Sequence, residues 1–250
     1  MEDFLQQYTA LAEYYDRLTG DVDYEQAAAR LDKLFQSNKK PIKLVLDLAC
    51  GTGSLTRLLS QRGYELISAD ASHEMLAVAR EKCRDLPVQP VFIGQSMEDL
   101  DLYGTIDAAV CTLDSVNYLT DLRQLRRAFS LVSLFLEPGG LFVFDVKSPA
   151  AFAALAGTVS CQEEQDFDCI WQYGFDPRSR LACHTVTFYL KEGERYRKEQ
   201  EEHFQRAWTV EQLTDTLDRA GLKLKGIYKG YTTKKAAEDD FRLLFVTEKR

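Results

Sequence analysis

Two glycines spaced two residues apart, Gly51 and Gly53, follow a short apolar run that contains an acid, Asp47. A glycine turn between a strand and a helix lets a phosphate or adenosine-bearing ligand approach the backbone closely. A dinucleotide fingerprint has a third Gly or Ala where this chain has Thr56. Asp47 would repel a pyrophosphate, but it suits an ammonium group. The turn therefore fits a ligand with an amino-acid tail, or it is a tight turn without a ligand.

A second acid, Asp70, ends the next apolar run, about 20 residues beyond the glycine turn, where an acid accepts hydrogen bonds from both ribose hydroxyls of a nucleotide. Met75 follows one helical turn later, and it either lies against a flat base or belongs to the helix core. Gln95, Ser96 and Met97 follow the third apolar run, where they would meet the edge of the base. These residues extend the glycine turn into a pocket for a nucleoside.

The segment "CTLDSVNYL" comes after the fourth apolar run, at the edge of the sheet where ligands of open α/β folds bind. We expect Asp114, Asn117 and Tyr118 to contact a substrate, with Asp114 orienting an amine and Tyr118 forming a wall. The alternative is an ordinary helix start that is capped by Asp114 or Ser115.

Strand-like and helical patterns alternate through residue 146, which indicates a parallel sheet with helices on both faces. Residues 1–36 predict an interrupted helical region, and residues 121–140 predict a long helix with a glycine stop. The expected strands of this part are residues 42–49, 64–70, 88–95, 105–113 and 141–146.

The pattern changes near residue 158 to short β-like runs that indicate an antiparallel meander with one wet face. Its aromatic residues either pack a small core of their own or form a substrate roof or a dimer surface. Strand alternation puts His184 and His203 either over the ligand edge or outside it. The expected division is a helical cap at 1–40, a core at 41–156 and 208–250, and a β insertion at 157–207.

The composition and charge of the chain limit the classes of function that it can have. The chain has 250 residues, 45% hydrophobic and 28% charged, which suits one large globular α/β unit. Its net charge of −8 argues against a nucleic-acid partner. No stretch approaches the ~20 apolar residues of a membrane helix, and the start does not resemble a secretory signal. We therefore expect a cytoplasmic protein, either a monomer or a homodimer.

The six cysteines form no C-x-x-C pair, so free thiols and no metal site are expected. The alternative is a zinc site from Cys161, Cys169, Cys183 and His184, whose spacing matches no common ligand pattern.

The segments "LDLACGTG", "SADASHEMLAVAR" and "DAAVCTLDSVNYL" together resemble successive motifs of the class I S-adenosylmethionine-dependent methyltransferases. The opening "LAEYYDRLTGDVDYE" and the β-rich insertion resemble the small-molecule members. The resemblance implies a Rossmann-like, doubly wound, mostly parallel seven-stranded sheet with its last strand antiparallel. It also implies S-adenosylmethionine as the cofactor and a small-molecule substrate that accepts the methyl group on nitrogen or oxygen.

The resemblance also assigns roles. Asp47 and the backbone from Ala49 to Gly53 would hold the methionine tail, and Asp70 would bind ribose. Ser96 stands where the family often has an acid. The residues that the resemblance and the motif positions place at the cofactor are Tyr15, Tyr24, Asp47, Ala49, Cys50, Gly51, Gly53, Asp70, Ala71, Met75, Gln95, Ser96, Met97, Cys111, Thr112 and Leu113.

Two other functions remain open. A non-catalytic protein that binds the cofactor could use the β insertion for docking. An NAD(P)-dependent oxidoreductase fits less well, because Thr56 and Asp47 depart from its fingerprint and no Y-x-x-x-K pair stands beside a suitable Ser.

Overall fold

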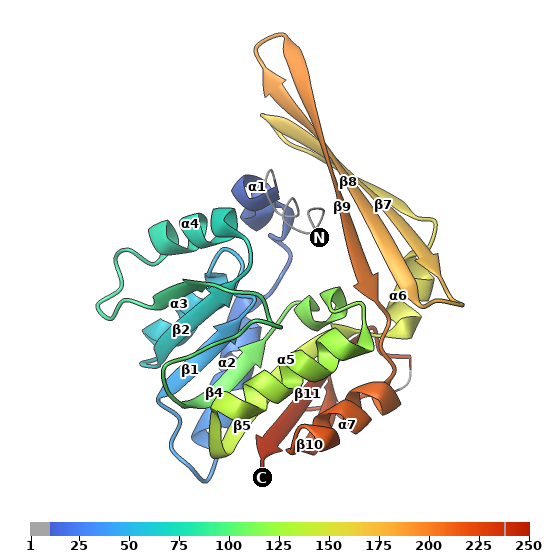
Figure 1. Ribbon diagram of the computed structural model, residues 1–250. Coiled ribbons are helices and arrows are strands. Elements are labelled where there is room, and N and C mark those ends of the chain that lie inside the picture. Colours follow the sequence, from blue (N-terminus) through green and yellow to red (C-terminus); the bar gives the residue numbers. More distant parts are fainter. Residues whose placement is uncertain (1–10, 238) are drawn as a thin grey trace.

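The computed structural model describes residues 11–237 and 239–250. Its centre is a seven-stranded sheet in the order β10-β11-β5-β4-β1-β2-β3 (Figure 1). The strands from β1 to β5 pair in parallel, and β11 runs antiparallel to both β5 and β10. This confirms the predicted fold class. The strands are β1 (Leu44–Leu48), β2 (Glu65–Asp70), β3 (Val91–Gly94), β4 (Ile106–Cys111), β5 (Leu136–Lys147), β10 (Leu222–Lys229) and β11 (Arg242–Lys249).

Helices cover both faces of this sheet. On one face Phe129 of α5 and Leu217 of α7 pack with strand residues such as Leu46. On the other face Leu31 of α2 and Leu59 of α3 pack around Val45. Neighbouring β1 residues thus face opposite layers, as expected for a strand that is buried on both sides. The helices are α2 (Tyr24–Gln36), α3 (Ser54–Gln61), α4 (His73–Lys82), α5 (Leu122–Phe135) and α7 (Val210–Arg219).

A second sheet rises from the ligand-binding edge of the first, and its long β8–β9 hairpin projects away from the body (Figure 1). Its four antiparallel strands are in the order β6-β7-β8-β9, which confirms the predicted meander. We call it the small sheet. Its strands are β6 (Val159–Glu163), β7 (Phe167–Asp176), β8 (Leu181–Glu192) and β9 (Arg195–Arg206).

The small sheet packs against the N-terminal helix α1 (Leu11–Leu18). Leu11 is buried with Phe167 and Phe188, and Tyr14 and Tyr15 pack against the same cluster. The small sheet and α1 thus form an apolar core that is separate from the core of the large sheet. Residues 1–10, where part of the helical prediction falls, lie outside the described residues.

The prediction of one helix over 121–140 is wrong at its end. Helix α5 stops at Phe135, and "LEPGG" already belongs to β5. Pro138 cannot donate a helical hydrogen bond, and Leu136 is buried and pairs with Ile106 of β4. A Cβ on Gly140 would lie 2.7 Å from the carbonyl oxygen of Asp107, so glycine is needed for this close approach.

The short helix α6 (Pro149–Leu155) was not predicted, whereas the 3-10 helix η2 (Ser115–Tyr118) corresponds to the helix start given as the alternative for this segment. Helix α6 begins with a Ser148 cap and leads from β5 to the small sheet. Within the described ranges, no helix has the length and apolar character that crossing a membrane requires.

Candidate active site

The glycine turn joins β1 to α3 with three left-handed residues, Ala49, Gly51 and Gly53, whose φ angles are 59°, 54° and 75°. A Cβ on Gly51 would meet nothing within 4 Å, so its backbone faces open space. A Cβ on Gly53 would lie 2.9 Å from the Cβ of Ala79 in α4. The first glycine therefore leaves room beside the turn, and the second lets α4 pack closely.

Asp47 lies under this turn and is only 1% exposed. The Thr56 hydroxyl donates to its carboxylate at 2.6 Å and lies 3.0 Å from the Ser68 hydroxyl. Burial raises the pKa of Asp47 to about 6, although the Thr56 hydrogen bond opposes the rise. The threonine at the third-glycine position therefore has a structural purpose, because it fixes this carboxyl group.

Asp70 joins the turns that follow β1 and β2. Its two carboxylate oxygens accept the backbone N–H groups of Gly51 at 2.8 Å and Ser72 at 2.9 Å. Burial raises its pKa, and these hydrogen bonds oppose the rise. The neighbouring Cys50 donates its backbone N–H to the Ala69 carbonyl at 3.0 Å. Asp70 thus lies beside the glycine turn, where its position at the end of the second strand places it.

The residues expected around the base are only partly available. Met75 is 2% exposed, which favours the helix-core alternative. The side-chain amide of Gln95 donates to the backbone carbonyl of Asp101 and accepts its N–H. The prediction that this amide contacts the adenine base is therefore withdrawn. Ser96 donates its hydroxyl to Asp99 at 2.9 Å. Asp99 thereby brings a carboxylate to the position where the resemblance indicated an acid.

Three further residues predicted to bind the cofactor are Met97, Cys111 and Ala71. The sulfur of Met97 is 3.8 Å from that of Cys111, which is fully buried in β4. Ala71, directly after Asp70, is exposed.

Helix α1 lies over the glycine turn. The Asp16 carboxylate accepts the Thr52 hydroxyl at 2.6 Å and pairs with Lys82 of α4 at 2.6 Å. Burial raises the pKa of Tyr24 to about 12. Burial also raises the pKa of Tyr15 well above its usual value, with smaller contributions from Tyr24, Asp114, Tyr118 and Asp70. Tyr15 packs against the core of the small sheet, and Tyr24 packs with the layer of α2 and α3.

The segment after β4 has two consecutive left-handed residues, Leu113 and Asp114, each with φ of 55°. Their backbone N–H groups donate to the Asp145 carboxylate at 2.7 and 3.1 Å. Consecutive N–H groups of this kind form a concave site for an anion. Here the buried Asp145 carboxylate of β5 fills this site, so the Leu113 N–H is not available to a ligand.

Tyr231 and Arg242 also donate hydrogen bonds to Asp145. The carbonyl of Thr112 accepts the Ser115 hydroxyl at 2.8 Å.

Asp114 has a different environment from the one predicted. Its carboxylate is held by Arg242 at 2.8 Å, Gln205 at 2.9 Å and Lys147 at 3.0 Å. Burial alone would raise the pKa of Asp114, but the charges of Lys147 and Arg242 outweigh burial and hold it at about 2. The carboxylate makes no helix-cap hydrogen bond. Three donors already occupy it, so we correct the expectation that it orients a substrate amine.

Asn117 is fully buried and bonded to the backbone. Its side chain donates to the carbonyls of Lys147 and Arg206 and accepts the Lys147 N–H at 3.0 Å. We withdraw substrate contact from Asn117, because it joins β5 to β9 instead. Tyr118 remains a candidate, since it is half-buried and its hydroxyl lies 3.4 Å from Nδ1 of His203.

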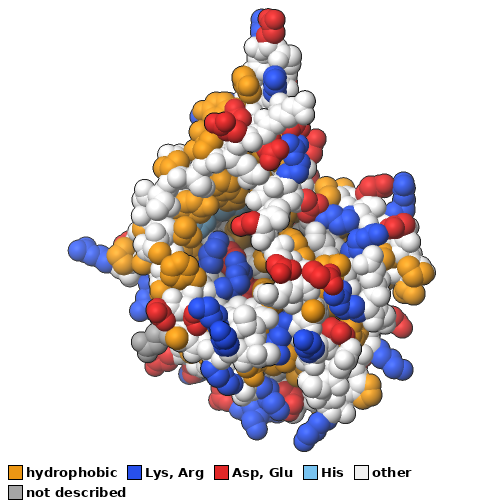
Figure 2. Space-filling model, turned by 180° about the vertical axis from the view of Figure 1, so that it is seen from behind, with side chains coloured by type: hydrophobic (Ala, Val, Ile, Leu, Met, Phe, Trp, Pro, Cys, Tyr) orange, Lys and Arg blue, Asp and Glu red, His pale blue; other side chains and the backbone are white. Residues whose placement is uncertain are grey.

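The inner face of the small sheet brings polar residues over this segment. Glu201, His203 and Gln205 alternate along β9 and are all buried. His184 lies directly opposite His203 in the pairing of β8 with β9, and its ring meets that of Tyr173 with centroids 5.0 Å apart. Figure 2 shows a hollow below the small sheet, with hydrophobic side chains around it, a histidine at its floor and Lys or Arg side chains at its lower rim.

Several residues of this network were not singled out from the sequence: Asp145, Lys147, Glu201, Gln205, Tyr231 and Arg242. Alternation along "EEHFQ" carries a weak signal for β9, because it puts a Glu, a His and a Gln on one face. The polar residues between them hide that signal.

The cysteines are free thiols and are not brought together with His184. In the part of the chain that the structure describes, no three His, Cys, Asp or Glu side chains form a group that could hold a metal ion.

Comparison with known proteins defines the class of this site. Residues 45–140 match a family model described as a methyltransferase domain. The chain is 29% identical over 245 residues to YqeM of Bacillus subtilis strain 168, which carries a provisional methyltransferase name, and the match covers 97% of each chain.

Solved structures agree with this match. An S-adenosylmethionine-dependent methyltransferase from Clostridium acetobutylicum ATCC 824 is 29% identical, with a TM-score of 0.87 and coverage of 97% of this chain and 98% of that one. The sugar N-methyltransferase KedS8 of Streptoalloteichus sp. ATCC 53650 shares the fold at 22% identity, with a TM-score of 0.78 and coverage of 94% and 92%. The chain is a class I S-adenosylmethionine-dependent methyltransferase, and S-adenosylmethionine is its cofactor.

The glycine turn fits this cofactor. The open space beside Gly51 leaves the turn accessible to a ligand. The buried Asp47 and the half-buried Asp70 give the surroundings a negative character that suits an amino-acid tail and ribose hydroxyls.

Proposed function

We propose that the protein transfers the methyl group of S-adenosylmethionine to an amine nitrogen of a small molecule bound in the hollow below the small sheet. The observation that carries this proposal is the position of that hollow (Figure 2). Tyr118, at the end of the short helix that follows β4, contacts His203 on the inner face of the small sheet. A molecule bound below the sheet would therefore lie beside the cofactor edge.

The charge of the chain supports a small acceptor. A net charge of −8 disfavours a polyanionic substrate, whose binding depends largely on Lys and Arg. Aromatic side chains such as Trp171 and Tyr173 on the small sheet offer flat surfaces for a compact molecule. The fold shared with a sugar N-methyltransferase extends over 94% of the chain and so includes this roof.

The acid-base chemistry favours nitrogen over oxygen. A neutral amine attacks without losing a proton first, whereas a hydroxyl needs a strong base during attack. Asp114, in the segment that follows β4, has a pKa of about 2 and is therefore a weak base. The site suits an acceptor that needs only mild deprotonation.

The cofactor supplies an electrophilic methyl group on a sulfonium, and the acceptor nitrogen forms the new bond as the carbon–sulfur bond breaks and leaves its electron pair on sulfur. The residues of the chain supply alignment, which can remove ~7–11 kcal/mol of the barrier. In our proposal Asp47 and the glycine turn hold the amino-acid tail and Asp70 holds the ribose. Ser96 and Met97 border the base, while Tyr15 and Tyr24 cover the cofactor.

The division of the chain follows the same proposal. Residues 1–40 would form the cap, 41–156 and 208–250 the cofactor-binding core, and 157–207 the substrate roof. The six free thiols fit a reducing cytoplasm.

A paired-acceptor assay tests this function. The protein is incubated with methyl-labelled cofactor and either an amino sugar or the same sugar with a hydroxyl in place of the amine. We expect a singly methylated amine by mass spectrometry and no product from the hydroxyl partner. Transfer to the hydroxyl sugar alone would overturn the choice of nitrogen.

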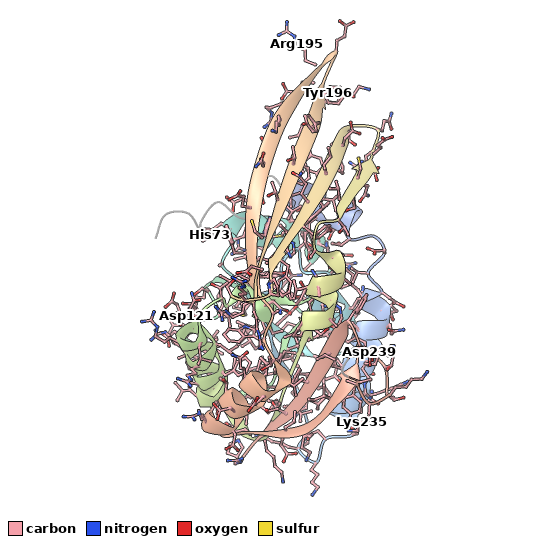
Figure 3. All side chains as sticks on the ribbon, turned by 90° about the vertical axis from the view of Figure 1, so that its right-hand side faces the viewer. His73, Asp121, Arg195, Tyr196, Lys235 and Asp239 are labelled. Atoms are coloured by element: carbon pink, nitrogen blue, oxygen red, sulfur yellow. The ribbon has the colours of Figure 1, made fainter. Side chains whose placement is uncertain are left out.

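Two tyrosines of the small sheet provide a matched pair of variants. Tyr173 faces His184, whereas Tyr196 lies at the tip of the β8–β9 hairpin, far from the body (Figure 3). Tyr173→Ala should raise the KM of the amine roughly tenfold or more, because it removes an aromatic contact. Tyr196→Ala should leave KM unchanged. Equal effects in both variants would contradict the hollow as the substrate site.

A further inference from the structure

We propose that Tyr118, His203 and Glu201 form a proton relay that removes a proton from the acceptor amine. This inference rests on the amine acceptor proposed above. The three residues come from η2 and β9, and their polar atoms follow one another from the β4 edge into the small sheet.

The contacts of His203 define the order of the relay. Its ring is 1% exposed, with Nδ1 at 3.4 Å from the Tyr118 hydroxyl and Nε2 at 3.3 Å from Oε2 of Glu201. The Tyr118 and His203 rings meet edge to face, with centroids 6.1 Å apart. Catalytic hydrogen bonds are often long before the substrate binds and then tighten.

Glu201 sets the tautomer of His203. Glu201 Oε2 lies at ion-pair distance from Nε2 but is not aligned for a hydrogen bond. Its negative charge favours the proton on Nε2 and leaves the lone pair of Nδ1 directed at Tyr118. The other oxygen of Glu201 accepts the Leu11 N–H at 3.2 Å, which fixes the carboxylate from helix α1. Glu201 is therefore a positioning residue, and it stabilises the imidazolium when His203 takes a proton.

His184 provides an internal contrast, because it lies directly opposite His203 on β8. Its Nε2 bonds to Oε1 of Gln205 at 3.0 Å, and its Nδ1 finds no hydrogen-bond partner among the described residues. Burial, together with the charge of Lys147, lowers its pKa to about 4. No carboxylate contacts its ring directly, so His184 stays neutral. Two facing histidines with such different partners indicate different roles.

The position of Tyr118 connects the relay to the cofactor edge. It ends η2, a few residues after β4. Its hydroxyl lies 3.4 Å from Nδ1 of His203 on β9. Tyr118 therefore lies between the segment that follows β4 and the small sheet.

The proton transfer balances without a further reactant. The acceptor ammonium gives a proton to the Tyr118 oxygen, while the hydroxyl proton of Tyr118 moves to Nδ1 of His203. The resulting imidazolium pairs through Nε2–H with the Glu201 carboxylate, and the proton later leaves to solvent. The nitrogen lone pair is then free to attack. The groups around His203 that titrate are Glu201 on its own strand, His184 on β8, Tyr118 on η2 and Tyr15 on α1.

The test compares His203→Gln with the matched control His184→Gln on two acceptors. One acceptor has an alkyl amine that is protonated at pH 7, and the other is its hydroxylamine analogue, which is neutral there. We expect His203→Gln to lower kcat for the alkyl amine roughly 10²–10⁴-fold, and for the hydroxylamine by less than about tenfold. The KM and the calorimetric affinity for S-adenosylmethionine should stay within about twofold. His184→Gln should lower both rates equally or not at all.

The pH profile gives a second readout. With the alkyl amine, the pH profile of the wild-type rate should contain a limb that depends on the relay, and His203→Gln should lack this limb. Tyr118→Phe, a change on a half-buried side chain, and Glu201→Gln should show the same preference for the neutral acceptor. Tyr118→Phe also replaces His203→Gln if that variant does not fold.

The outcomes separate the two proposals. An active wild type whose His203→Gln and Tyr118→Phe variants lose both acceptors equally would overturn the relay and leave amine methylation intact. A wild type that binds S-adenosylmethionine but methylates no amine would overturn both.

Discussion

At the scale of single residues, Asp70 links the two turns that border the proposed cofactor site. Replacing it with alanine removes charge-assisted hydrogen bonds to ribose, so Asp70→Ala should weaken S-adenosylmethionine binding by ~1.5–3 kcal/mol. Isothermal titration calorimetry measures this loss. Asp85→Ala is the control, because Asp85 pairs with Arg57 at the surface. If Asp70→Ala left the affinity unchanged, the proposal that Asp70 binds the cofactor ribose would be wrong.

Asp47 predicts a pH effect on stability. Its folded pKa of about 6 lies above its ordinary value of 3.8 because the carboxyl group is buried. The unfolded chain therefore ionises first, so the folded state loses stability as pH rises from about 4 through about 6. Asp47→Asn keeps an acceptor for Thr56 without this ionisation.

Urea unfolding checks this effect. Asp47→Asn should match the wild type near pH 4 and become more stable than it above pH 7, by at most about 3 kcal/mol. The same variant should bind S-adenosylmethionine more weakly, because it loses the charge that faces the ammonium group. A stability difference that does not vary with pH would show that Asp47 is ionised throughout.

At the scale of elements, α1 is attached to the glycine turn through Asp16, which contacts Thr52 and Lys82. Asp16→Ala should loosen the cap, because it removes polar contacts that tie α1 to the glycine turn and to Lys82. We expect faster hydrogen exchange in residues 11–18 and faster release of S-adenosylhomocysteine in stopped-flow measurements. Glu13→Ala, an exposed change on the same helix, serves as control. Equal exchange in both variants would show that Asp16 does not hold the cap.

The buried network at the β4 edge also belongs to this scale. Arg242 of β11, Asp145 of β5 and Gln205 of β9 meet at Asp114 or its backbone. Together with Lys147 of β5, these side chains hold two left-handed residues that would otherwise be strained. The same network joins the small sheet to the large one.

At the scale of the whole molecule, the acidic charge predicts insensitivity to polyanions. A protein that binds nucleic acid loses ~10³–10⁵ in affinity between about 50 and 200 mM salt, because counterions are released. Methylation of a small amine by this chain should change less than about twofold over that range. An excess of tRNA should not inhibit it. Strong inhibition by tRNA that salt relieves would contradict the small-molecule assignment.

The small sheet combines two of the alternatives that its sequence left open. It packs an apolar core with α1 around Phe167 and Phe188, and its inner polar face covers the hollow. The tip with Arg195 and Tyr196 extends beyond both (Figure 3).

The amino-acid sequence by itself determined the parallel core and the glycine turn. Alternating apolar runs specify buried strands, and the spacing of Gly51, Gly53 and Asp70 fixes one edge of the sheet, since these are local properties. Sequence patterns missed the end of α5, because burial of Leu136 against β4 overrides a continuous helical period. They also misassigned Asn117, whose partners are backbone atoms of distant strands.

Only the tertiary structure decided the polar partners at the β4 edge. Arg242 and Asp114 are 128 positions apart, and Tyr118 and His203 are 85 apart. Such pairs form because strand order and register bring β11, β9 and η2 to one place, and no local pattern encodes that meeting. The sequence therefore determined the glycine turn, whereas the packing of the small sheet over the large one decided which side chains surround the proposed acceptor site.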